Sequence, residues 1–395
     1  MEVKLGYKHT EMGFLPDDWE VRRLSEHFRI YAGGDVPKHS LSQTQSGSHQ
    51  YPIFANALQD RGLYGYTNER RSKADSLTIT ARGYLGHAEY RHQLFFPIVR
   101  LLVLEPIGQL DARFTSYAVN DRVEFAIEST GVPQLTAPQV GKYSVAAPPT
   151  IQEQRAIATA LSDVDALLGG LDRLIAKKRD LKRAAMQQLL TGETRLPGFH
   201  GEWEAVEFGD IASIRNAKVL PSSTPAGTRC VELESIGQGT GRLLMSAEAT
   251  GLSSKYSFRQ GDVLFGRLRA YLRKYWLATF DGVCSTEIWP LVARDERLSG
   301  SFLHLLVQTN DFVNAAGVSY GTHMPRSDWS VLKKFPVRIP PVPEQTAIAA
   351  VLSDMDSELA ALEARRCKTC DLKQAMMQEL LTGKTRLVPA GVTYA

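Results

Sequence analysis

The residues best suited to do chemistry in this chain are clusters of basic and aromatic side chains. The densest run lies in the C-terminal half and contains Arg267, Arg269, Tyr271, Arg273, Lys274, Tyr275 and Trp276. A looser set in the N-terminal half contains Arg70, Arg71, Lys73, Arg82 and Tyr84. Arginine forms paired hydrogen bonds with guanine edges and ion pairs with phosphates, and aromatic rings pack on sugars or bases. These runs predict contact with DNA. The alternative is a solvated strand edge with Tyr271, Tyr275 and Trp276 in the core.

Motifs for catalysis are absent or incomplete. Gly383-Lys384-Thr385 resembles the end of a phosphate-binding loop, but Gln378 stands where its first glycine belongs, and the triplet closes a predicted helix. Gly237-x-Gly239-x-Gly241 lies in a polar turn without a strand–helix context. The sequence contains neither an Asn-Pro-Pro-Tyr type tetrapeptide nor a His-x-x-x-His pair. We therefore expect no catalytic residue in this chain.

Cys367-x-x-Cys370 has a spacing that binds zinc, but a zinc site needs two further ligands. The other cysteines, Cys230 and Cys284, are single and distant in sequence. We expect no metal and no cofactor bound by this chain.

A long internal repeat organises the chain. Residues 151–196 align without gaps with residues 342–387, and 25 of the 46 positions are identical. Glu153-Gln154 matches Glu344-Gln345 near the start, and both copies end in Leu-Leu-Thr-Gly-x-Thr-Arg-Leu.

Each copy of the repeat predicts one long helix. Pro148-Pro149 and Pro340-Pro341 precede the two copies, and Glu153 and Glu344 lie in the first turn, where the helix dipole favours acidic residues. Gly192 and Gly383 stand where a C-terminal glycine cap is expected. About 40 residues at 1.5 Å each give a helix of roughly 60 Å.

Apolar residues recur at steps of three and four in both copies, as in a coiled coil. The matched pairs are Ile157/Ile348, Leu161/Leu352, Val164/Met355, Leu168/Leu359 and Leu171/Leu362. We predict that the two helices pack as an antiparallel pair. The alternative is two helices that belong to separate globular cores.

The two repeats divide the chain into four segments. Globular segments of α+β class are predicted at 1–148 and 197–339, the first helical segment at 149–196, and the second with the C-terminal tail at 340–395. The globular segments echo each other faintly, since Asp75-x-Leu77-x4-Arg82-x-Tyr84-Leu85 resembles Asp262-x-Leu264-x4-Arg269-x-Tyr271-Leu272. The chain is therefore interpreted as a tandem duplication with pseudo-two-fold symmetry.

Composition bounds the class of protein. The 395 residues carry 46 Lys+Arg and 43 Asp+Glu, a net charge of +3, which argues against a polybasic tail or an acidic disordered protein. Residues 1–148 contain 16 basic and 16 acidic residues, so the basic side chains are clustered and not in excess. No run of 18 apolar residues occurs, and the first 20 residues lack the apolar core of a signal peptide. A cytoplasmic location is expected.

Over nearly its full length, the chain resembles the DNA-specificity subunits of type I restriction-modification enzymes. The resemblance rests on the Met12-Gly-x-Leu-Pro16-x-x-Trp19-Glu opening, the paired Glu-Gln motifs and the paired helix ends. Tyr31-x-Gly33-Gly34-x-x-Pro37 and Tyr51-Pro52-Ile53 also resemble openings of target-recognition domains of that family.

The resemblance implies a division of labour. Each globular segment is a target-recognition domain for one half of a bipartite DNA site, and the two helices set the spacer and dock two methyltransferase subunits. Restriction subunits join this core, and S-adenosylmethionine, ATP and Mg²⁺ are expected on the partner subunits. The partner and spacer residues are then Glu153, Gln154, Ile157, Leu161, Leu168, Leu171, Glu344, Gln345, Ile348, Leu352, Leu359 and Leu362.

Two other functions remain open. One is the specificity subunit of a related system in which one partner chain both cleaves and methylates, and the genes neighbouring this one would identify it. The other is a coiled-coil scaffold that does not bind DNA, which a gel shift on random duplex would distinguish.

Overall fold

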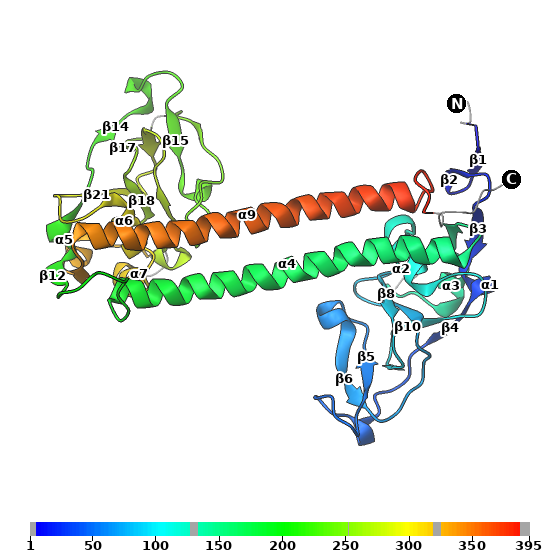
Figure 1. The fold of residues 1–395 in the computed structure, drawn as a ribbon. Coiled ribbons are helices and arrows are strands. Elements are labelled where there is room, and N and C mark those ends of the chain that lie inside the picture. Colours follow the sequence, from blue (N-terminus) through cyan, green and yellow to red (C-terminus); the bar gives the residue numbers. More distant parts are fainter. Residues whose placement is uncertain (1–4, 127–132, 252, 319–324, 388–395) are drawn as a thin grey trace. The chain divides into compact units, whose positions relative to one another are not determined.

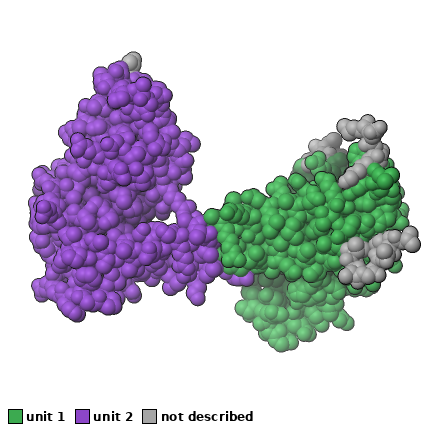
Figure 2. Space-filling model, turned by 45° about the horizontal axis from the view of Figure 1, so that its top comes forward, with its two compact units in different colours: residues 1–172, 364–395 green, residues 173–363 purple. Residues whose placement is uncertain are grey.

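Two long helices and two globular parts make up the fold (Figure 1). The computed structural model describes residues 5–126, 133–251, 253–318 and 325–387. The chain divides into two compact units, unit 1 with residues 1–172 and 364–395, and unit 2 with residues 173–363 (Figure 2). Within the described ranges, none of the helices combines the length and apolar character needed to cross a bilayer.

Unit 1 is built on a four-stranded antiparallel sheet of order β4-β10-β7-β8. Its strands are β4 (Phe28–Ala32), β7 (Ser76–Ile79), β8 (Ala88–Arg91) and β10 (Leu102–Pro106). Helix α2 (Ala112–Arg122) packs on β7 and β8, because its buried face meets the apolar side of the sheet. Leu77, Leu104 and Phe114 lie in this core.

Smaller elements complete unit 1. A three-stranded sheet of order β6-β5-β9 contains β5 (Tyr51–Phe54), β6 (Leu63–Thr67) and β9 (Phe96–Pro97). Two strand pairs join β1 (Tyr7–Thr10) to β2 (Gly13–Pro16) and β3 (Glu20–Arg23) to β11 (Ser144–Ala147). The short helices are α1 (Leu24–His27) and α3 (Ala137–Gly141), and a capping box at Thr136 begins α3.

Unit 2 repeats the main sheet of unit 1 with different residues. Its order is β13-β21-β18-β19, again wholly antiparallel, with β13 (Ala212–Ile214), β18 (Val263–Gly266), β19 (Tyr275–Leu277) and β21 (Ile288–Ala293). Helix α6 (Gly300–Leu306) packs on this sheet, and α7 (Asn310–Gly317) reaches it through the contact of Phe312 with Phe265 of β18. Short elements again precede and follow the sheet, namely β12 (Glu204–Glu207), α5 (Phe208–Ile211), α8 (Trp329–Leu332) and β22 (Pro336–Ile339).

The two units differ most in their second sheet. In unit 2 it has five strands in the order β14-β17-β20-β15-β16. These are β14 (Lys218–Val219), β15 (Arg229–Val231), β16 (Ala247–Glu248), β17 (Lys255–Phe258) and β20 (Gly282–Cys284). A shared main sheet with an unlike second sheet is the arrangement expected of a duplicated framework whose variable parts have diverged.

The predicted long helices are present as α4 (Ile151–Thr191) and α9 (Val342–Leu380). Gly192 and Gly383, with φ of 74° and 69°, adopt the left-handed conformation of a C-terminal cap. A Cβ at Gly383 would lie 2.6 Å from Pro16 and 2.9 Å from Trp19, so no larger residue fits there.

Within each unit the two helices run antiparallel. In unit 2, Lys178 pairs with Glu358 at 2.6 Å and Lys182 with Asp356 at 2.5 Å, so partners descend along α9 as α4 ascends. In unit 1, Asp165 pairs with Lys373 at 2.6 Å and Asp172 with Arg366 at 2.5 Å. The Asp165–Lys373 pair is the repeat-related counterpart of Asp356–Lys182, which confirms the antiparallel packing in each unit.

Candidate nucleic-acid interface

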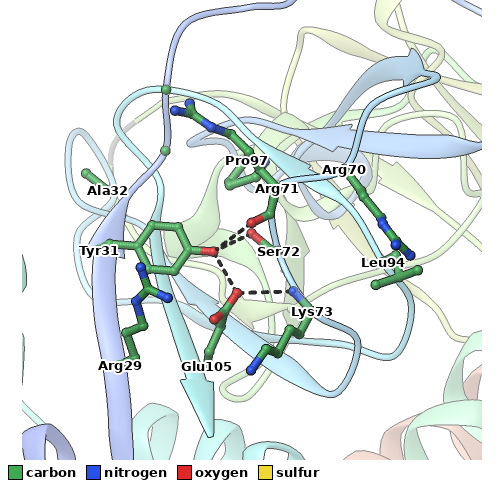
Figure 3. Close-up of a pocket in the computed structure, with 12 residues that line it drawn as sticks. Arg29, Tyr31, Ala32, Arg70, Arg71, Ser72, Lys73, Leu94, Pro97 and Glu105 are labelled. Atoms are coloured by element: carbon green, nitrogen blue, oxygen red, sulfur yellow. Dashed lines mark hydrogen bonds between the residues drawn. The ribbon is translucent and has the colours of Figure 1, made fainter.

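The first predicted basic run, Arg70, Arg71 and Lys73, lines an open cavity of about 630 Å³ in unit 1 (Figure 3). We call this cavity the basin. Its wall consists of residues from β4 and the two glycines after it, from the segment after β6, from the chain around β9 and from β10. These residues are Arg29, Tyr31, Ala32, Gly33, Gly34, Arg70, Arg71, Ser72, Lys73, Leu94, Pro97 and Glu105. All three predicted residues of the run are exposed to solvent.

Buried hydrogen bonds fix the segment that carries these cations. The Tyr31 hydroxyl lies 2.8 Å from Glu105 Oε1 and 2.7 Å from Ser72 Oγ, and the Lys73 backbone N–H donates to the same Glu105 oxygen. Burial raises the pKa of Tyr31 to about 12, so the hydroxyl stays neutral and able to donate. The backbone N–H groups of Arg71 and Ser72 both donate to the Phe95 carbonyl at 3.1 Å. The cations therefore project from an ordered backbone.

Two glycines allow the close packing on the other side of the basin. A Cβ at Gly34 would overlap the Arg71 guanidinium, and a Cβ at Gly33 would lie 2.6 Å from the Ile98 carbonyl oxygen. Gly34 therefore lets the Arg71 side chain lie directly against the backbone, and Gly33 lets the backbone of Pro97 and Ile98 approach closely. This explains the Gly-Gly pair in the Tyr31-x-Gly33-Gly34 motif.

Arg82 and Tyr84, the other predicted residues of unit 1, lie on an exposed loop after β7. The Asn56 side chain holds the base of this loop, because its Oδ1 accepts from the Ala81 and Arg82 N–H groups and its Nδ2 donates to the Arg82 carbonyl. Tyr84 is 65% exposed, which leaves its ring free to meet a partner.

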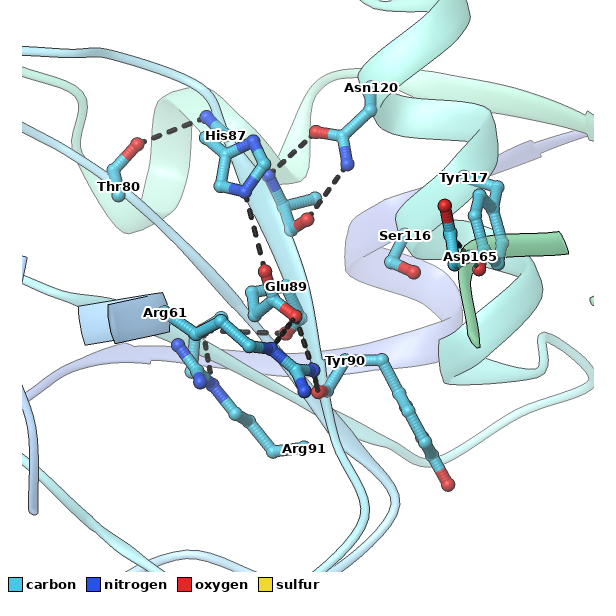
Figure 4. A network of polar contacts seen from close by, with 12 residues as sticks. Arg61, Thr80, His87, Glu89, Tyr90, Arg91, Ser116, Tyr117, Asn120 and Asp165 are labelled. Carbon is cyan, nitrogen blue, oxygen red and sulfur yellow. Dashed lines mark hydrogen bonds and ion pairs between the residues drawn. The ribbon is translucent and has the colours of Figure 1, made fainter. Parts of the chain in front are cut away.

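A polar network supports the same loop from β8 and α2 (Figure 4). The His87 N–H donates to Thr80 Oγ1 at 3.0 Å, closing the turn. Asn120 of α2 makes both backbone hydrogen bonds with Ala88, each at 2.8 Å, and so occupies the edge of β8. The Tyr117 hydroxyl donates to Asp165 of α4 at 2.7 Å. The loop is thus linked through α2 to the long helix.

The second predicted run divides into exposed and anchored residues. Arg269 is exposed and Tyr271 is 60% exposed. By contrast, Arg273 donates to the Gln308 carbonyl and Asn310, and Lys274 donates to the Leu233 carbonyl at 2.7 Å. Arg273 and Lys274 are half-buried and donate within the protein, so their DNA contact stays a prediction.

Arg267 is also anchored. Its guanidinium lies 5.1 Å from the Trp289 ring centre and donates to the Ser327 carbonyl. Tyr275 and Trp276 are buried, as the alternative interpretation of the run expected. Arg269 and Tyr271 are the members of the run whose side chains are most exposed.

The two exposed loops are held in the same way. In unit 1, Arg82 bridges to Gln134 and the Leu135 N–H donates to the Ala81 carbonyl. In unit 2, Leu268 bridges to Arg326 and the Ser327 N–H donates to the Arg267 carbonyl. Both loops thus sit at corresponding positions of the shared main sheet.

The faint echo between the globular segments is wrong by one residue. Leu77 faces the core beneath α2, and in unit 2 Val263 faces the corresponding core, whereas Leu264 faces the other side of its sheet. The strand pairing also matches Leu77 with Val263, because Leu77 pairs with Leu104 of β10 and Val263 pairs with Leu291 of β21. A slip of one residue reverses every side chain of a strand. Gly83, with φ of 75°, therefore corresponds to Arg269, with φ of 53°, and Arg82 does not.

The repeated Glu-Gln motif anchors each helix start inside its unit. Glu153, whose side chain is 0% exposed, accepts from Arg386 at 2.6 and 2.8 Å, and Glu344 accepts from Arg195 at 2.5 and 2.6 Å. Gln154 Nε2 donates to the Gln109 and Pro148 carbonyls while its Oε1 accepts from the Asp111 N–H. Gln345 forms the equivalent set with Arg297, Pro340 and Ser299. These four side chains are buried and present no surface to another subunit.

The predicted apolar seam belongs partly to the globular cores. Ile157 and Leu161 lie in the core of unit 1 with Leu380 and Leu381, and Ile348 and Leu352 lie in that of unit 2 with Leu189 and Leu190. Both sequence interpretations therefore hold in part, because the ends of the helices complete globular cores. Leu171 and Leu359 are buried further along, and Leu168 and Leu362 are half-buried.

Sequence reasoning missed several residues of the site. Arg29, Tyr31 and Glu105 join the basin from strands distant in sequence from the basic run, and no local pattern marks them. The arginines of the repeated Thr-Arg-Leu ends and the glutamates of the repeated Glu-Gln motifs were both visible, but their pairing was not. The Cys367-x-x-Cys370 pair lies on α9, and among the described residues no group of three or more His, Cys, Asp or Glu is arranged to hold a metal.

Comparison with known proteins shows one consistent match. A family model described as the type I restriction modification DNA specificity domain matches residues 16–176 and again residues 200–369.

Curated relatives and a solved structure agree with this. The type I restriction enzyme EcoDI specificity subunit of Escherichia coli is 23% identical over 376 residues, which cover 85% of this chain and 81% of that protein. The MjaVIII specificity subunit of Methanocaldococcus jannaschii is 21% identical, with 94% of each chain covered. The crystal structure of the S subunit of a type I restriction-modification system from M. genitalium matches with a TM-score of 0.64 at 14% identity, covering 96% of this chain and 98% of that one.

Proposed function

The chain belongs to the type I restriction-modification DNA specificity family, and on that premise we propose that it selects the DNA site for a methyltransferase complex. Its relatives are named specificity subunits, which are the non-catalytic components of type I complexes. The chain carries two target-recognition domains in tandem, one in each half. Selection of a site by two such domains is the function that remains to be tested.

The observation that carries this proposal is the duplicated main sheet with its exposed loop. Both units hold a basic or aromatic loop at the same place after the third strand of the sheet order, with Arg82 and Tyr84 in one unit and Arg269 and Tyr271 in the other. The unlike second sheets supply different neighbouring surfaces. Each unit therefore recognises a different half of a bipartite site.

The long helices serve as the spacer and the docking element. Their buried Glu–Arg and Gln contacts fix how each helix end enters its unit, and their exposed sides are available to two methyltransferase subunits. S-adenosylmethionine, ATP and Mg²⁺ belong to the methyltransferase and restriction subunits, and this chain binds none of them. The complex acts on cellular DNA in the cytoplasm.

A selection experiment tests the function. The full chain with its methyltransferase partner is incubated with a library of randomised duplexes, and bound duplexes are sequenced. The expected consensus consists of two short blocks separated by a gap of fixed length. Enrichment of one contiguous block, or no enrichment, would contradict the proposal and would favour the scaffold alternative.

Arg269→Ala is expected to relax recognition at one half-site only. Loss of a base contact by an exposed arginine costs about 1–3 kcal/mol of discrimination at the contacted position. Competition binding against single-base variants of both half-sites measures the change. Arg259→Ala is the matched control, because Arg259 is an exposed arginine of the same unit outside the loop. Equal discrimination by wild type and Arg269→Ala at every position would remove Arg269 from the interface.

A further inference from the structure

The geometry points to a phosphate-binding site in unit 1, and we propose that the basin clamps one backbone phosphate of the half-site duplex. We further propose that unit 2 has no equivalent of this clamp. The inference rests on the proposed DNA-recognition function and adds to it the chemical group bound and the unit that binds it.

Uncompensated positive charge in a concave site is the first support. Arg29, Arg70, Arg71 and Lys73 all line the basin, and within the described ranges none of them lies within ion-pair distance of a carboxylate. Elsewhere in the chain, buried or half-buried cations such as Arg195 and Arg215 are paired with acids. Four unpaired cations around one cavity repel one another, and an anion in the cavity relieves that repulsion.

The single carboxylate of the basin is already engaged. Glu105 is 4% exposed, and its Oε1 accepts from the Tyr31 hydroxyl at 2.8 Å and from the Lys73 backbone N–H at 3.1 Å. Its role is therefore to hold the segment of residues 71–73. From this segment the Arg71 guanidinium lies against the Gly34 backbone, and the Lys73 side chain extends in a different direction (Figure 3). The order of this segment before binding lowers the entropic cost of taking up a ligand.

The chemistry of the wall favours a phosphate over a base edge. The four cationic side chains of the basin offer hydrogen-bond donors, and a phosphate presents only acceptors. Base edges lie recessed in the grooves and are reached by protruding side chains, whereas phosphates project from the duplex. A concave, donor-lined basin fits the projecting group, and the protruding loop with Arg82 and Tyr84 fits a groove.

Unit 2 has an ion-paired arginine at the position that matches Tyr31. Ile30 pairs with Leu104 in the main sheet of unit 1, and Ile214 pairs with Leu291 in that of unit 2. Since Leu104 and Leu291 occupy the same position of the sheet, Ile30 and Ile214 correspond. The next residues are Tyr31 in unit 1 and Arg215 in unit 2. Arg215 is locked in a two-bond ion pair with buried Asp262, at 2.7 and 2.9 Å. This guanidinium is neutralised within the protein, whereas Tyr31 in unit 1 bonds the segment that carries Arg71 and Lys73.

The salt dependence of DNA binding tests the clamp. The full chain with its methyltransferase partner is titrated with its selected duplex at several salt concentrations. Arg71→Gln and Lys73→Gln are each expected to weaken all duplex sequences equally and to lower the log–log salt slope by about 1. Lys142→Gln, which removes an exposed cation of the same unit outside the basin, is expected to leave the slope nearly unchanged. Arg71→Lys keeps the positive charge and is expected to retain the wild-type salt slope.

Single methylphosphonate substitutions locate the phosphate. Wild type is expected to lose affinity when one phosphate beside the unit 1 half-site is neutralised, and Arg71→Gln is expected to show no further loss at that position. Inorganic phosphate in place of duplex is expected to compete only at concentrations far above those of the DNA.

Three results would overturn the clamp. The first is that the basin variants change the preference among duplex sequences but not the salt slope. The second is that Lys142→Gln lowers the salt slope as much as Arg71→Gln does. The third is that both basin variants bind duplex with wild-type affinity. In each case wild type still selects its site, so the proposed function stands while the clamp fails. Failure of wild type to bind any duplex would instead contradict the proposed function.

Discussion

Duplicating seven residues in α9 alone is expected to destroy cooperative folding of the chain, whereas matched duplications in α4 and α9 leave it intact. The stretch from Asp165 to Lys182 on α4 and the stretch from Asp356 to Lys373 on α9 are equally long, and their ends form the Asp165–Lys373 and Lys182–Asp356 pairs. Lengthening one helix makes these pairs incompatible. It also pulls the buried helix ends out of their cores.

The matched variant duplicates residues 173–179 in α4 and 357–363 in α9. A seven-residue unit preserves the apolar repeat, and it repeats the Lys178–Glu358 and Arg179–Glu363 pairs. Thermal unfolding followed by circular dichroism measures the outcome. A single transition near the wild-type midpoint is expected for the matched variant and a broad, lowered one for α9 alone. Equal unfolding of the two variants would show that the helices are not coupled through these contacts.

Arg386→Ala is expected to destabilise unit 1 by about 3 kcal/mol, because it leaves the buried Glu153 carboxylate without its partner. Arg386 also donates to Asp18 at 2.8 and 2.9 Å, so one side chain joins the end of α9 to the start of α4 and to the N-terminal segment. Chemical denaturation of the full chain measures the free energy of unfolding.

Two comparisons isolate the buried charge as the cause. Arg183→Ala, which removes a 79%-exposed side chain paired with Asp180 on the same helix, is expected to change the free energy of unfolding by less than about 0.5 kcal/mol. Adding Glu153→Gln to Arg386→Ala is expected to restore part of the loss, because the unpaired charge is gone. A loss for Arg386→Ala no larger than that for Arg183→Ala would refute the structural role assigned to the pair.

The long helices were predictable because their signals are local. Prolines before Ile151 and Val342, glycines after the last turn and a three–four apolar repeat each act within a few residues. The antiparallel pairing was also predictable from the repeat. What the periodicity does not reveal is that Ile157 and Ile348 pack into globular cores, because an apolar stripe does not identify its partner.

The division of the basic run from Arg267 to Trp276 was not predictable from the sequence. Arg269 and Arg273 are both arginines and both lie next to apolar or aromatic residues in the sequence. Nevertheless, Arg273 donates to the Gln308 carbonyl, whereas Arg269 is exposed. Both residues have left-handed backbone, with φ of 53° and 50°, and they stand at opposite ends of the short turn Ala270–Leu272. Non-glycine residues adopt this conformation rarely, so the sequence carries no clear signal for it.

The basin was predictable only in part. Arg70, Arg71 and Lys73 are adjacent in sequence and were identified, but Arg29, Tyr31 and Glu105 reach them through the pairing of β4 with β10. Cross-strand neighbours depend on register, and the one-residue error in the echo between the globular segments shows how easily register is misjudged. The tertiary structure was therefore necessary to see that the cations share one cavity.

Mapping of methylated bases in a host genome tests the central claim most directly. Cells carry the methyltransferase partner with either the wild-type chain or the matched two-helix duplication. Wild type is expected to direct methylation to a split motif with a fixed gap. The duplication is expected to keep both half-sites and lengthen the gap by about 3 base pairs, since seven residues at 1.5 Å span about 10.5 Å. A contiguous motif, or altered half-sites with an unchanged gap, would contradict recognition by two units on a helical spacer.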